Sequence, residues 1–181
     1  MTTFIKNLIT SLIVVGLTTS AVNAADFYFR TDAASSDPTD AANWAAQNGT
    51  AQSAAPTGAD HWHIHAGSTV DIATTVNANQ FRTGMMYNGS STGFGPEPSG
   101  ETNVSVNSGG TLNTSANLFA GMTWNRDAGP GQAKVTINTG GAVNVGSNLI
   151  IGNLYNQNNS STVTGEVVVA GGSLTGNAVN I

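Results

Sequence analysis

The sequence predicts an all-β protein that folds as a β-solenoid, with coils of about 31 residues that follow an irregular N-terminal capping segment. Three observations lead to this prediction. Gly-Gly pairs recur at equal spacing, at 109–110, 140–141 and 171–172. Short runs that alternate apolar and polar residues flank these pairs, as in strands with one buried face. An aromatic residue followed by asparagine also returns in the same register, and a constant period is the signature of stacked repeats.

Each full repeat contains three short apolar segments. The first precedes the Gly-Gly pair (104–106, 135–137, 167–169), the second follows it (111–113, 142–144, 173–175), and the third ends in a closing glycine (117–121, 148–152). An earlier copy is looser: Gly67–Asp71 matches the Gly-Gly-Thr-Leu-Asn unit, and Gln80–Gly84 matches the Asn-Leu-Phe-Ala-Gly unit. We therefore divide the chain into a leader (1–24), a capping segment (25–66) and solenoid coils (67–181).

In such coils the apolar residues point inward and Ser, Thr and Asn point outward. Glycines take the corners, where a positive φ or a close backbone neighbour requires them. Coils stack about 4.8 Å apart, so Asn107 is expected over Asn138 and Asn113 over Asn144, as amide ladders. The alternative is a β-sandwich with a strand every 8–12 residues. It explains the density of strands but not the constant period.

Residues 1–24 have the three parts of a secretory signal. Lys6 gives the positive region, residues 8–17 form the apolar core, and Val22 and Ala24 are the small residues before the expected cleavage site. The alternative is a membrane anchor, but the apolar run is shorter than the roughly 20 residues that a bilayer needs. We expect cleavage after Ala24 and no transmembrane segment in the mature chain, which would be secreted or held at a bacterial cell surface.

The composition excludes several classes of protein. Only 8% of the residues are charged and the net charge is −5, whereas a nucleic-acid binder needs a basic face. Helical bundles need abundant Glu, Lys and Arg, which are scarce here. With no cysteine, the chain is not a disulfide-stapled domain.

From about Asn43 onward the chain resembles secreted bacterial β-solenoid proteins of the autotransporter-passenger and PEP-CTERM-associated type. The resemblance rests on an opening segment, with Asn43-Trp44, Pro56–Asp60, Ile64 and Gly67–Val70, and on the Val-x-Val/Ile…Gly-Gly-x-Leu/Val-Asn repeat. It implies a right-handed parallel β-helix at the cell surface or outside the cell, and no particular activity.

Aromatic-asparagine pairs follow the closing glycines and form the first candidate site. They are Tyr87-Asn88, Trp124-Asn125 and Tyr155-Asn156. Stacked coils would align them as an aromatic column along one edge, where flat rings beside amides suit the faces and hydroxyls of an extracellular polysaccharide. The alternative is a structural column that packs loops against the coils, at about 0.5–1.5 kcal/mol per aromatic pair.

His61, His63 and His65 form the second candidate site, because they alternate with Trp62 and Ile64. On a strand the three imidazoles share one face, where neighbouring rings could hold Zn²⁺, Ni²⁺ or Cu²⁺. The structural alternative is an outward polar face, with Trp62 and Ile64 filling the first coil.

The sequence gives little support for an enzyme. No two equivalent coil positions both carry acids, and no nucleophile elbow, P-loop or dinucleotide fingerprint is present. We expect no enzymatic activity, no cofactor and no nucleic-acid partner. The expected function is that of an exported structural or adhesive protein of the cell surface or extracellular matrix. The alternatives are a carbohydrate-binding module that uses the aromatic column, and the N-terminal part of a β-helix polysaccharide lyase or hydrolase.

The pattern places the next closing glycine just beyond Ile181, so the last copy stops in mid-coil. Two explanations stay open. The sequence is a fragment of a longer gene, or the open end stacks on the next subunit and builds a fibre by head-to-tail contact.

Overall fold

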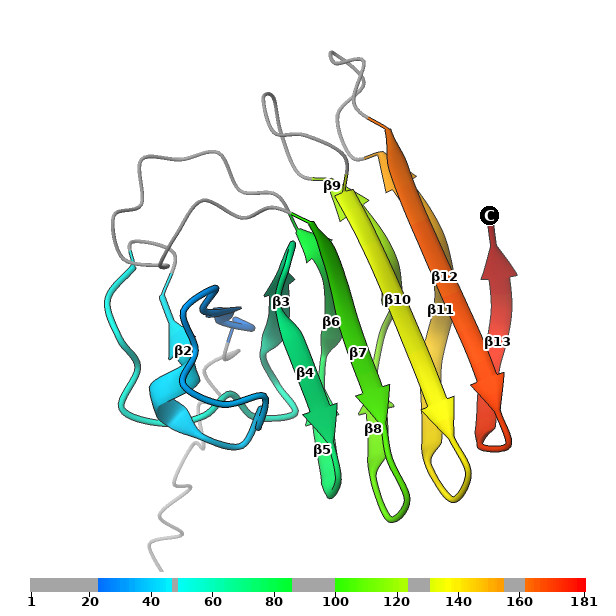
Figure 1. Ribbon diagram of the computed structural model, residues 1–181, viewed down its shortest axis with the longest axis horizontal. Helices are drawn as coiled ribbons and strands as arrows, with labels where there is room; N and C mark the ends of the chain where they lie inside the picture. Colours follow the sequence, from blue (N-terminus) through cyan, green and yellow to red (C-terminus); the bar gives the residue numbers. More distant parts are fainter. Residues whose placement is uncertain (1–22, 47–48, 86–99, 124–130, 155–161) are drawn as a thin grey trace, which may run out of the picture.

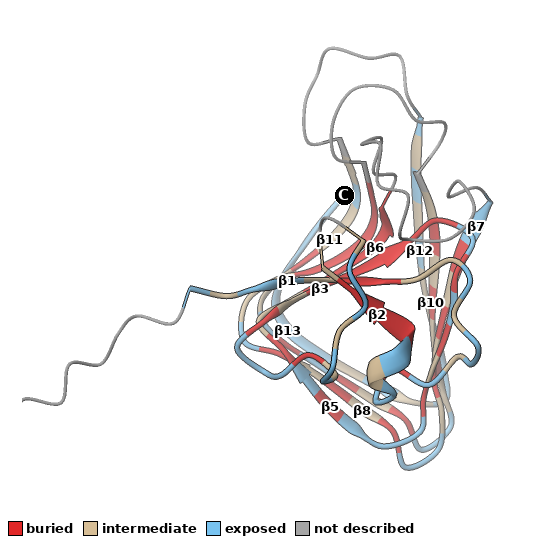
Figure 2. Cartoon of the chain, turned by 90° about the vertical axis from the view of Figure 1, so that its left-hand side faces the viewer, coloured by how far each residue is buried: buried red, intermediate tan, exposed pale blue. Residues whose placement is uncertain are grey.

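The computed structural model describes residues 23–46, 49–85, 100–123, 131–154 and 162–181. Four coils stack along one axis, and each coil is roughly triangular in cross-section (Figures 1 and 2). The described strand pairs between coils are all parallel. The predicted β-solenoid is confirmed. The β-sandwich alternative is wrong, because its sheets would be built from antiparallel pairs.

The first face of the solenoid is a four-stranded sheet. Its strands, in stacking order, are β4 (Thr69–Ile72), β7 (Glu101–Val106), β10 (Gly131–Asn138) and β12 (Val163–Ala170). Their inward residues include Val70, Val104 and Val135, which stack as a column with at most 1% of each exposed. β-Branched residues fit this position because both the pleat and the close coil spacing favour them.

The second and third faces belong to one nine-stranded sheet, because two long strands run through the corner between them. The second face holds β5 (Thr75–Ala78), β8 (Thr111–Thr114) and the first parts of β11 (Ala142–Leu154) and β13 (Ser173–Asn180). The third face holds β3 (His61–His65), β6 (Gln80–Met85), β9 (Leu118–Thr123) and the second parts of β11 and β13.

The period of the sequence sets the register between coils. Leu112 pairs with Val143, which pairs with Leu174, so the step along the chain is the same both times. On the first face, however, the step from Val135 to its partner Val167 is one residue longer. The difference arises because the corner after β12 is one residue shorter than the corner after β10.

The structure corrects the alignment of the first coil. Thr69–Asp71 does not stack under the unit that follows the Gly-Gly pair; Val70 pairs with Val104, in the strand before it. Val76 of β5 takes the place under Leu112 instead. The sequence match misled because Gly67 also has a positive φ, of 79°, but at the earlier corner, between β3 and β4. The match of Gln80–Gly84 is confirmed, since Phe81 pairs with Leu118.

The two glycines of a Gly-Gly pair serve different needs. Gly140 has φ +78°, a conformation that favours glycine. Gly141 is needed because the coil below passes close to it: an added Cβ would lie 2.3 Å from the carbonyl oxygen of Val106. Both predicted reasons for corner glycines are therefore confirmed.

The predicted amide ladders are confirmed as hydrogen bonds. Asn138 Nδ2 donates to Asn107 Oδ1 at 2.9 Å, and Asn144 Nδ2 donates to Asn113 Oδ1 at 2.8 Å. The second ladder is longer than predicted, because Asn113 Nδ2 donates to Asn77 and Thr175 Oγ1 donates to Asn144. It joins all four coils on the outer surface of the second face.

The capping segment closes the N-terminal end of the solenoid. It contains β1 (Asp26–Phe29), the 3₁₀ helix η1 (Ala41–Asn43) and β2 (Trp44–Ala45). β1 pairs in parallel with β3 and in antiparallel with β2, so it extends the third face by two strands. Trp44 is fully buried and its indole nitrogen donates to the carbonyl of Pro38. Its ring meets Phe29 and Trp62 edge-on, with centroids 5.2 and 5.1 Å away.

Candidate functional site

The three histidines lie on β3, with Trp62 and Ile64 facing the core as expected. The opposite face is not an outward polar surface, however, because His63 is 2% exposed and His65 is fully buried. That part of the structural interpretation is wrong. The covering comes from the neighbouring strand, since the Tyr28 ring stacks on His63 at 4.5 Å and lies 5.7 Å from His65.

Strand register builds a polar group around His63, which we call the histidine cluster: Asp26, Tyr28, His61, His63, His65, Gln80 and Arg82. Tyr28 and Arg82 are the direct partners of His63 on β1 and β6. The His63 Nε2 atom lies 2.7 Å from Asp26 Oδ1 and 3.2 Å from Arg82 Nη1. The Arg82 guanidinium also donates to Gln80 Oε1.

Burial and hydrogen bonding oppose each other in this cluster. Burial lowers the pKa of His63, although the hydrogen bond with Asp26 works in the other direction. That same hydrogen bond is the main cause that lowers the pKa of Asp26. The two shifts agree on a neutral His63 beside an ionised Asp26. With its proton on Nε2, the ring donates to Asp26, and the same atom then cannot accept a hydrogen bond from Arg82. Burial lowers the pKa of His65 further, to about 3.

The histidine cluster is closed to solvent at His63. The Nδ1 atom of His63 is buried and has no hydrogen-bond partner, so the ring nitrogen that would accept a proton from a substrate faces no solvent. Among the residues that the structure describes, no group of three His, Cys, Asp or Glu side chains is placed to hold a metal ion. The metal site at His61, His63 and His65 stays a prediction.

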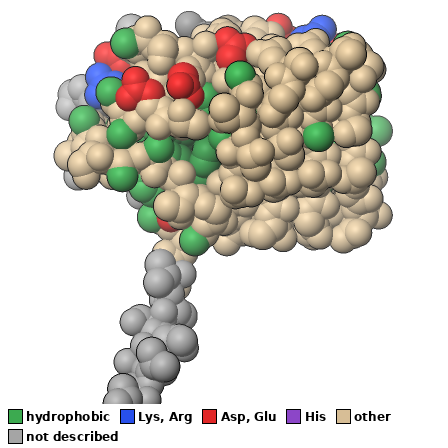
Figure 3. Space-filling view, turned by 90° about the horizontal axis from the view of Figure 1, so that it is seen from below, with side chains coloured by type: hydrophobic (Ala, Val, Ile, Leu, Met, Phe, Trp, Pro, Cys, Tyr) green, Lys and Arg blue, Asp and Glu red, His purple; other side chains and the backbone are tan. Residues whose placement is uncertain are grey.

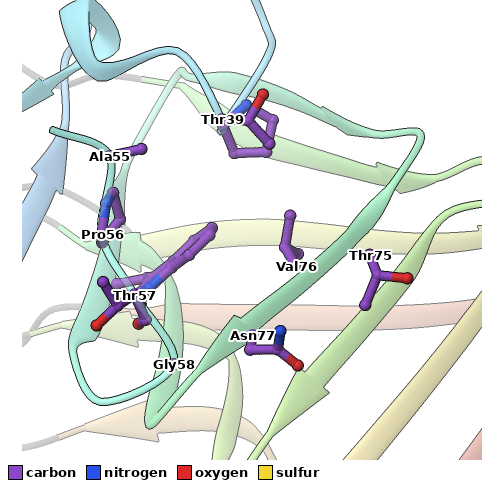
Figure 4. A pocket seen from close by; sticks show the side chains of 10 residues that line it. Thr39, Ala55, Pro56, Thr57, Gly58, Thr75, Val76 and Asn77 are labelled. Atoms are coloured by element: carbon purple, nitrogen blue, oxygen red, sulfur yellow. Dashed lines mark hydrogen bonds between the residues drawn. The ribbon is translucent and has the colours of Figure 1, made fainter.

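A groove between the cap and the first coil is the second candidate site (Figures 3 and 4). Sequence reasoning missed it. β5 is the end strand of its sheet, and two stretches of the capping segment stand beside it without pairing along it. They enclose a cavity of about 210 Å³. Its lining, which we call the cap groove, consists of Pro38, Thr39, Ala55, Pro56, Thr57, Gly58, Trp62, Thr75, Val76 and Asn77.

The chemistry of the cap groove is uncharged. Trp62, Val76 and two prolines supply apolar surface, while three threonines and Asn77 supply hydroxyl and amide groups. Two further cavities of about 240 Å³ each follow the same seam, between residues 29–39 and the first face. Seen from the side of the cap groove, the surface of the coils has few charged side chains (Figure 3).

The residues of the aromatic column, Tyr87, Asn88, Trp124, Asn125, Tyr155 and Asn156, lie outside the described residues. One pattern in the sequence could have predicted the histidine cluster. Polar residues alternate with apolar or small ones in three segments, at 26/28, 61/63 and 80/82. This shared pattern could have predicted that the three segments are neighbouring strands with these side chains on the same face.

The class that this fold defines is a β-solenoid of four coils with an N-terminal cap. Comparisons of the chain with protein-family models, curated proteins and solved structures find no match. Within the ranges that the structure describes, no helix has the length and apolar character needed to cross a bilayer.

Proposed function

We propose that this chain is an exported, non-enzymatic structural protein of a bacterial cell surface or extracellular matrix. It would belong with the secreted solenoids of the autotransporter-passenger and PEP-CTERM-associated type that its repeats resemble. The observation that carries the proposal is the side-chain ladder through all four coils, from Asn77 to Thr175. In ladders of this kind, exposed polar side chains form hydrogen bonds between neighbouring coils. Such bonds stiffen the stack of coils, as a rod-shaped structural protein requires.

Two further features support the proposal. The leader at 1–24 has the pattern of a cleaved export signal. The outward positions of the second face are mostly Thr, Asn and Ser, whose side chains can hydrogen-bond with water or with a neutral polymer.

Export is tested by producing the full chain with its own leader in a bacterium and fractionating the cells. We expect the protein outside the inner membrane with Ala25 as its first residue, measured by intact mass. Ala24→Phe replaces the small residue that the signal peptidase requires and should leave the leader attached. Full-length protein that stays in the cytoplasm contradicts the proposal.

The structural role is tested on the exported protein. We expect it to remain with the insoluble surface or matrix fraction after washing, and to show no turnover of a panel of polysaccharides. Release of reducing or unsaturated sugar ends would instead favour the lyase or hydrolase alternative.

A second candidate function, binding of a neutral polysaccharide, is favoured by the cap groove. Its volume of about 210 Å³ is small, and its apolar lining with a few hydroxyl and amide groups is the usual make-up of a ligand pocket. A single sugar ring matches both the size and the chemistry. In this proposal the sugar lies at the cap, not on the aromatic column.

Matched variants separate these sites. Thr75 and Thr111 are partners on neighbouring strands, but only Thr75 lines the groove. We expect Thr75→Arg to abolish pull-down on an insoluble neutral polysaccharide, while Thr111→Arg and Trp124→Ala leave it unchanged. Loss with Trp124→Ala would favour the aromatic column. No binding by the unchanged protein contradicts both sites.

A further inference from the structure

Asp60 is a nearly buried carboxylate immediately before β3, with 8% of the residue exposed. Its Oδ2 accepts from the backbone nitrogen of Thr57 at 2.8 Å and from the Thr57 hydroxyl at 2.7 Å. Its backbone nitrogen donates to the carbonyl of Thr57, and its own carbonyl accepts from Asn79. These bonds fix the carboxylate in one place.

Asp60 has no cationic side chain as its partner in the part of the chain that the structure describes. The ion pairs found there involve Asp26, Asp32 and Glu166. Burying a carboxylate is costly unless a positive charge or strong hydrogen bonds compensate. Asp60 receives only neutral donors, so no cationic side chain compensates its carboxylate.

The remaining oxygen of Asp60 faces the residue expected to follow the cleaved leader. Oδ1 accepts from the backbone nitrogen of Ala25 at 3.3 Å, a long bond. The carbonyl of Ala25 accepts from the His61 nitrogen at 2.8 Å, so this residue is anchored beside β3. Asn23 and Ala25 are exposed and Ala24 is partly buried, so the expected cleavage site lies at the surface.

We propose that Asp60 is the receptor for the α-ammonium group that cleavage after Ala24 creates, so that removal of the leader locks β1 onto the cap. This inference rests on the proposed export. Hydrolysis of the Ala24–Ala25 bond consumes one water and turns a neutral amide nitrogen into an ammonium group with three donors. The weak amide contact then becomes a charged one, which is shorter and about twice as strong.

The other charged groups near Ala25 do not compete for this role. Asp26 comes next in the chain, but its carboxylate is bonded to His63 and lies 3.8 Å from the Arg82 guanidinium. His61 faces Asp26 in register, and burial lowers its pKa, so it stays neutral near pH 7. Asp60 is therefore the acid best placed for the new terminus.

The test uses purified chains with defined first residues. One begins at Ala25, a second is identical but N-acetylated, and a third begins at Asn23; each is made with Asp60 and as the Asp60→Asn variant. Acetylation changes no side chain, so it isolates the terminal charge. Melting temperature at pH 6 is measured for each chain. The pKa of the α-amine is followed by NMR in the chains whose terminus is free.

In the Ala25 chain we expect the α-amine pKa above its ordinary range of about 7.7–8.0, and an ordinary value once Asp60 is replaced. Asp60→Asn should lower the melting temperature by about 3–6 °C more in this chain than in the acetylated or Asn23 chains. A raised pKa in the folded state also means that this extra stability is lost as the pH rises through that value.

Equal costs of Asp60→Asn in all three chains, or an unshifted α-amine pKa in the Ala25 chain, would overturn the inference. Because Asp60→Asn also weakens the bonds to Thr57, the comparison of free and acetylated Ala25 chains provides a readout that needs no substitution. Failure of the export proposal shows instead in the first residue of the exported protein, so the two failures are distinguishable.

Discussion

At the N-terminal end of the stack, β1 and β2 extend the third face and Trp44 is fully buried, whereas at the other end Val169 and Val179 are 49% and 59% exposed. On the first face, Val135 in an inner coil is fully buried, while its partner Val167 in the last described coil is only partly buried.

The difference teaches that an inward position is buried only when a coil or the cap lies on each side of it. Burial, and the stability that comes with it, therefore depends on place in the stack more than on residue type, as nearest-neighbour models of repeat proteins require. At the N-terminal end a cap of different sequence replaces the missing coil, and its aromatic residues fill the space that a coil would fill.

The largest expected effect is at the cap. Trp44→Ala removes a fully buried ring and should cost about 3–5 kcal/mol of unfolding free energy. Leu174→Ala, in the partly buried last coil, should cost only about 1–2 kcal/mol, because part of its surface already meets water. Denaturant unfolding of both variants measures the contrast. Equal losses would contradict the view that the cap replaces a coil.

Acid should act on the capped end first. His65 is neutral in the folded protein, where its pKa is about 3, and takes up a proton in the unfolded chain below about pH 6.5. The unfolded state then binds more protons, so stability falls as the pH falls from 6.5 towards 3, by about 2–3 kcal/mol by pH 4.5. His65→Gln should flatten this dependence. An unchanged slope in that variant would place the acid sensitivity elsewhere.

The cost of replacing a glycine should depend on how closely the neighbouring coil approaches it. An alanine Cβ at Gly141 would lie 2.3 Å from the Val106 carbonyl oxygen, and the strain should cost about 1–3 kcal/mol. At Gly176 the nearest atom is the Val145 Cβ at 3.3 Å, so Gly176→Ala should change stability by less than about 1 kcal/mol. Thermal unfolding of both variants measures the two losses of stability. A larger loss for Gly176→Ala than for Gly141→Ala would contradict this prediction.

Smaller effects are expected along the ladder. Asn113 is bonded to the coils on both sides, whereas Thr175 donates to only one. Asn113→Ala should cost about 1 kcal/mol and Thr175→Val about half of that. A double-mutant cycle between Asn113 and Asn144 measures the bond itself, and zero coupling would show that the ladder adds no stability.

The smallest expected effect is that of the ion pair between Lys134 and Glu166, at 3.1 Å on the outer surface. Both side chains are at least a third exposed, so Lys134→Met should change stability by no more than about 0.5 kcal/mol. Adding salt to the unchanged protein should have a similarly small effect. A larger loss would indicate that the first face depends on charge near its last strand.

The period and the inward-outward alternation were enough to predict the coils, their glycine corners and the amide pairs Asn107–Asn138 and Asn113–Asn144. These features repeat, so each copy checks the others. The first coil was misaligned because its corner after β4 lacks the Gly-Gly pair, and a different positive-φ glycine, Gly67, stood in for it.

The candidate site was less predictable, because it occurs once. The alternation on β3 predicted that the histidines share a face, but the burial of His63 and His65 depends on Tyr28, which lies much earlier in the chain. No local pattern shows that β1 would lie beside β3 in parallel. The cap groove depends on an unpaired edge of β5, a property of sheet order that a single strand's sequence does not carry.

The nearly constant step along the chain between stacked strands, in the inner and outer coils alike, has a consequence for the order of assembly. Loop-closure entropy depends on the number of residues enclosed, so every added coil faces nearly the same entropic cost, however many precede it. The cap and first coil are complete by Met85. They can therefore serve as a template for the residues that follow, and each new coil needs only the one before it.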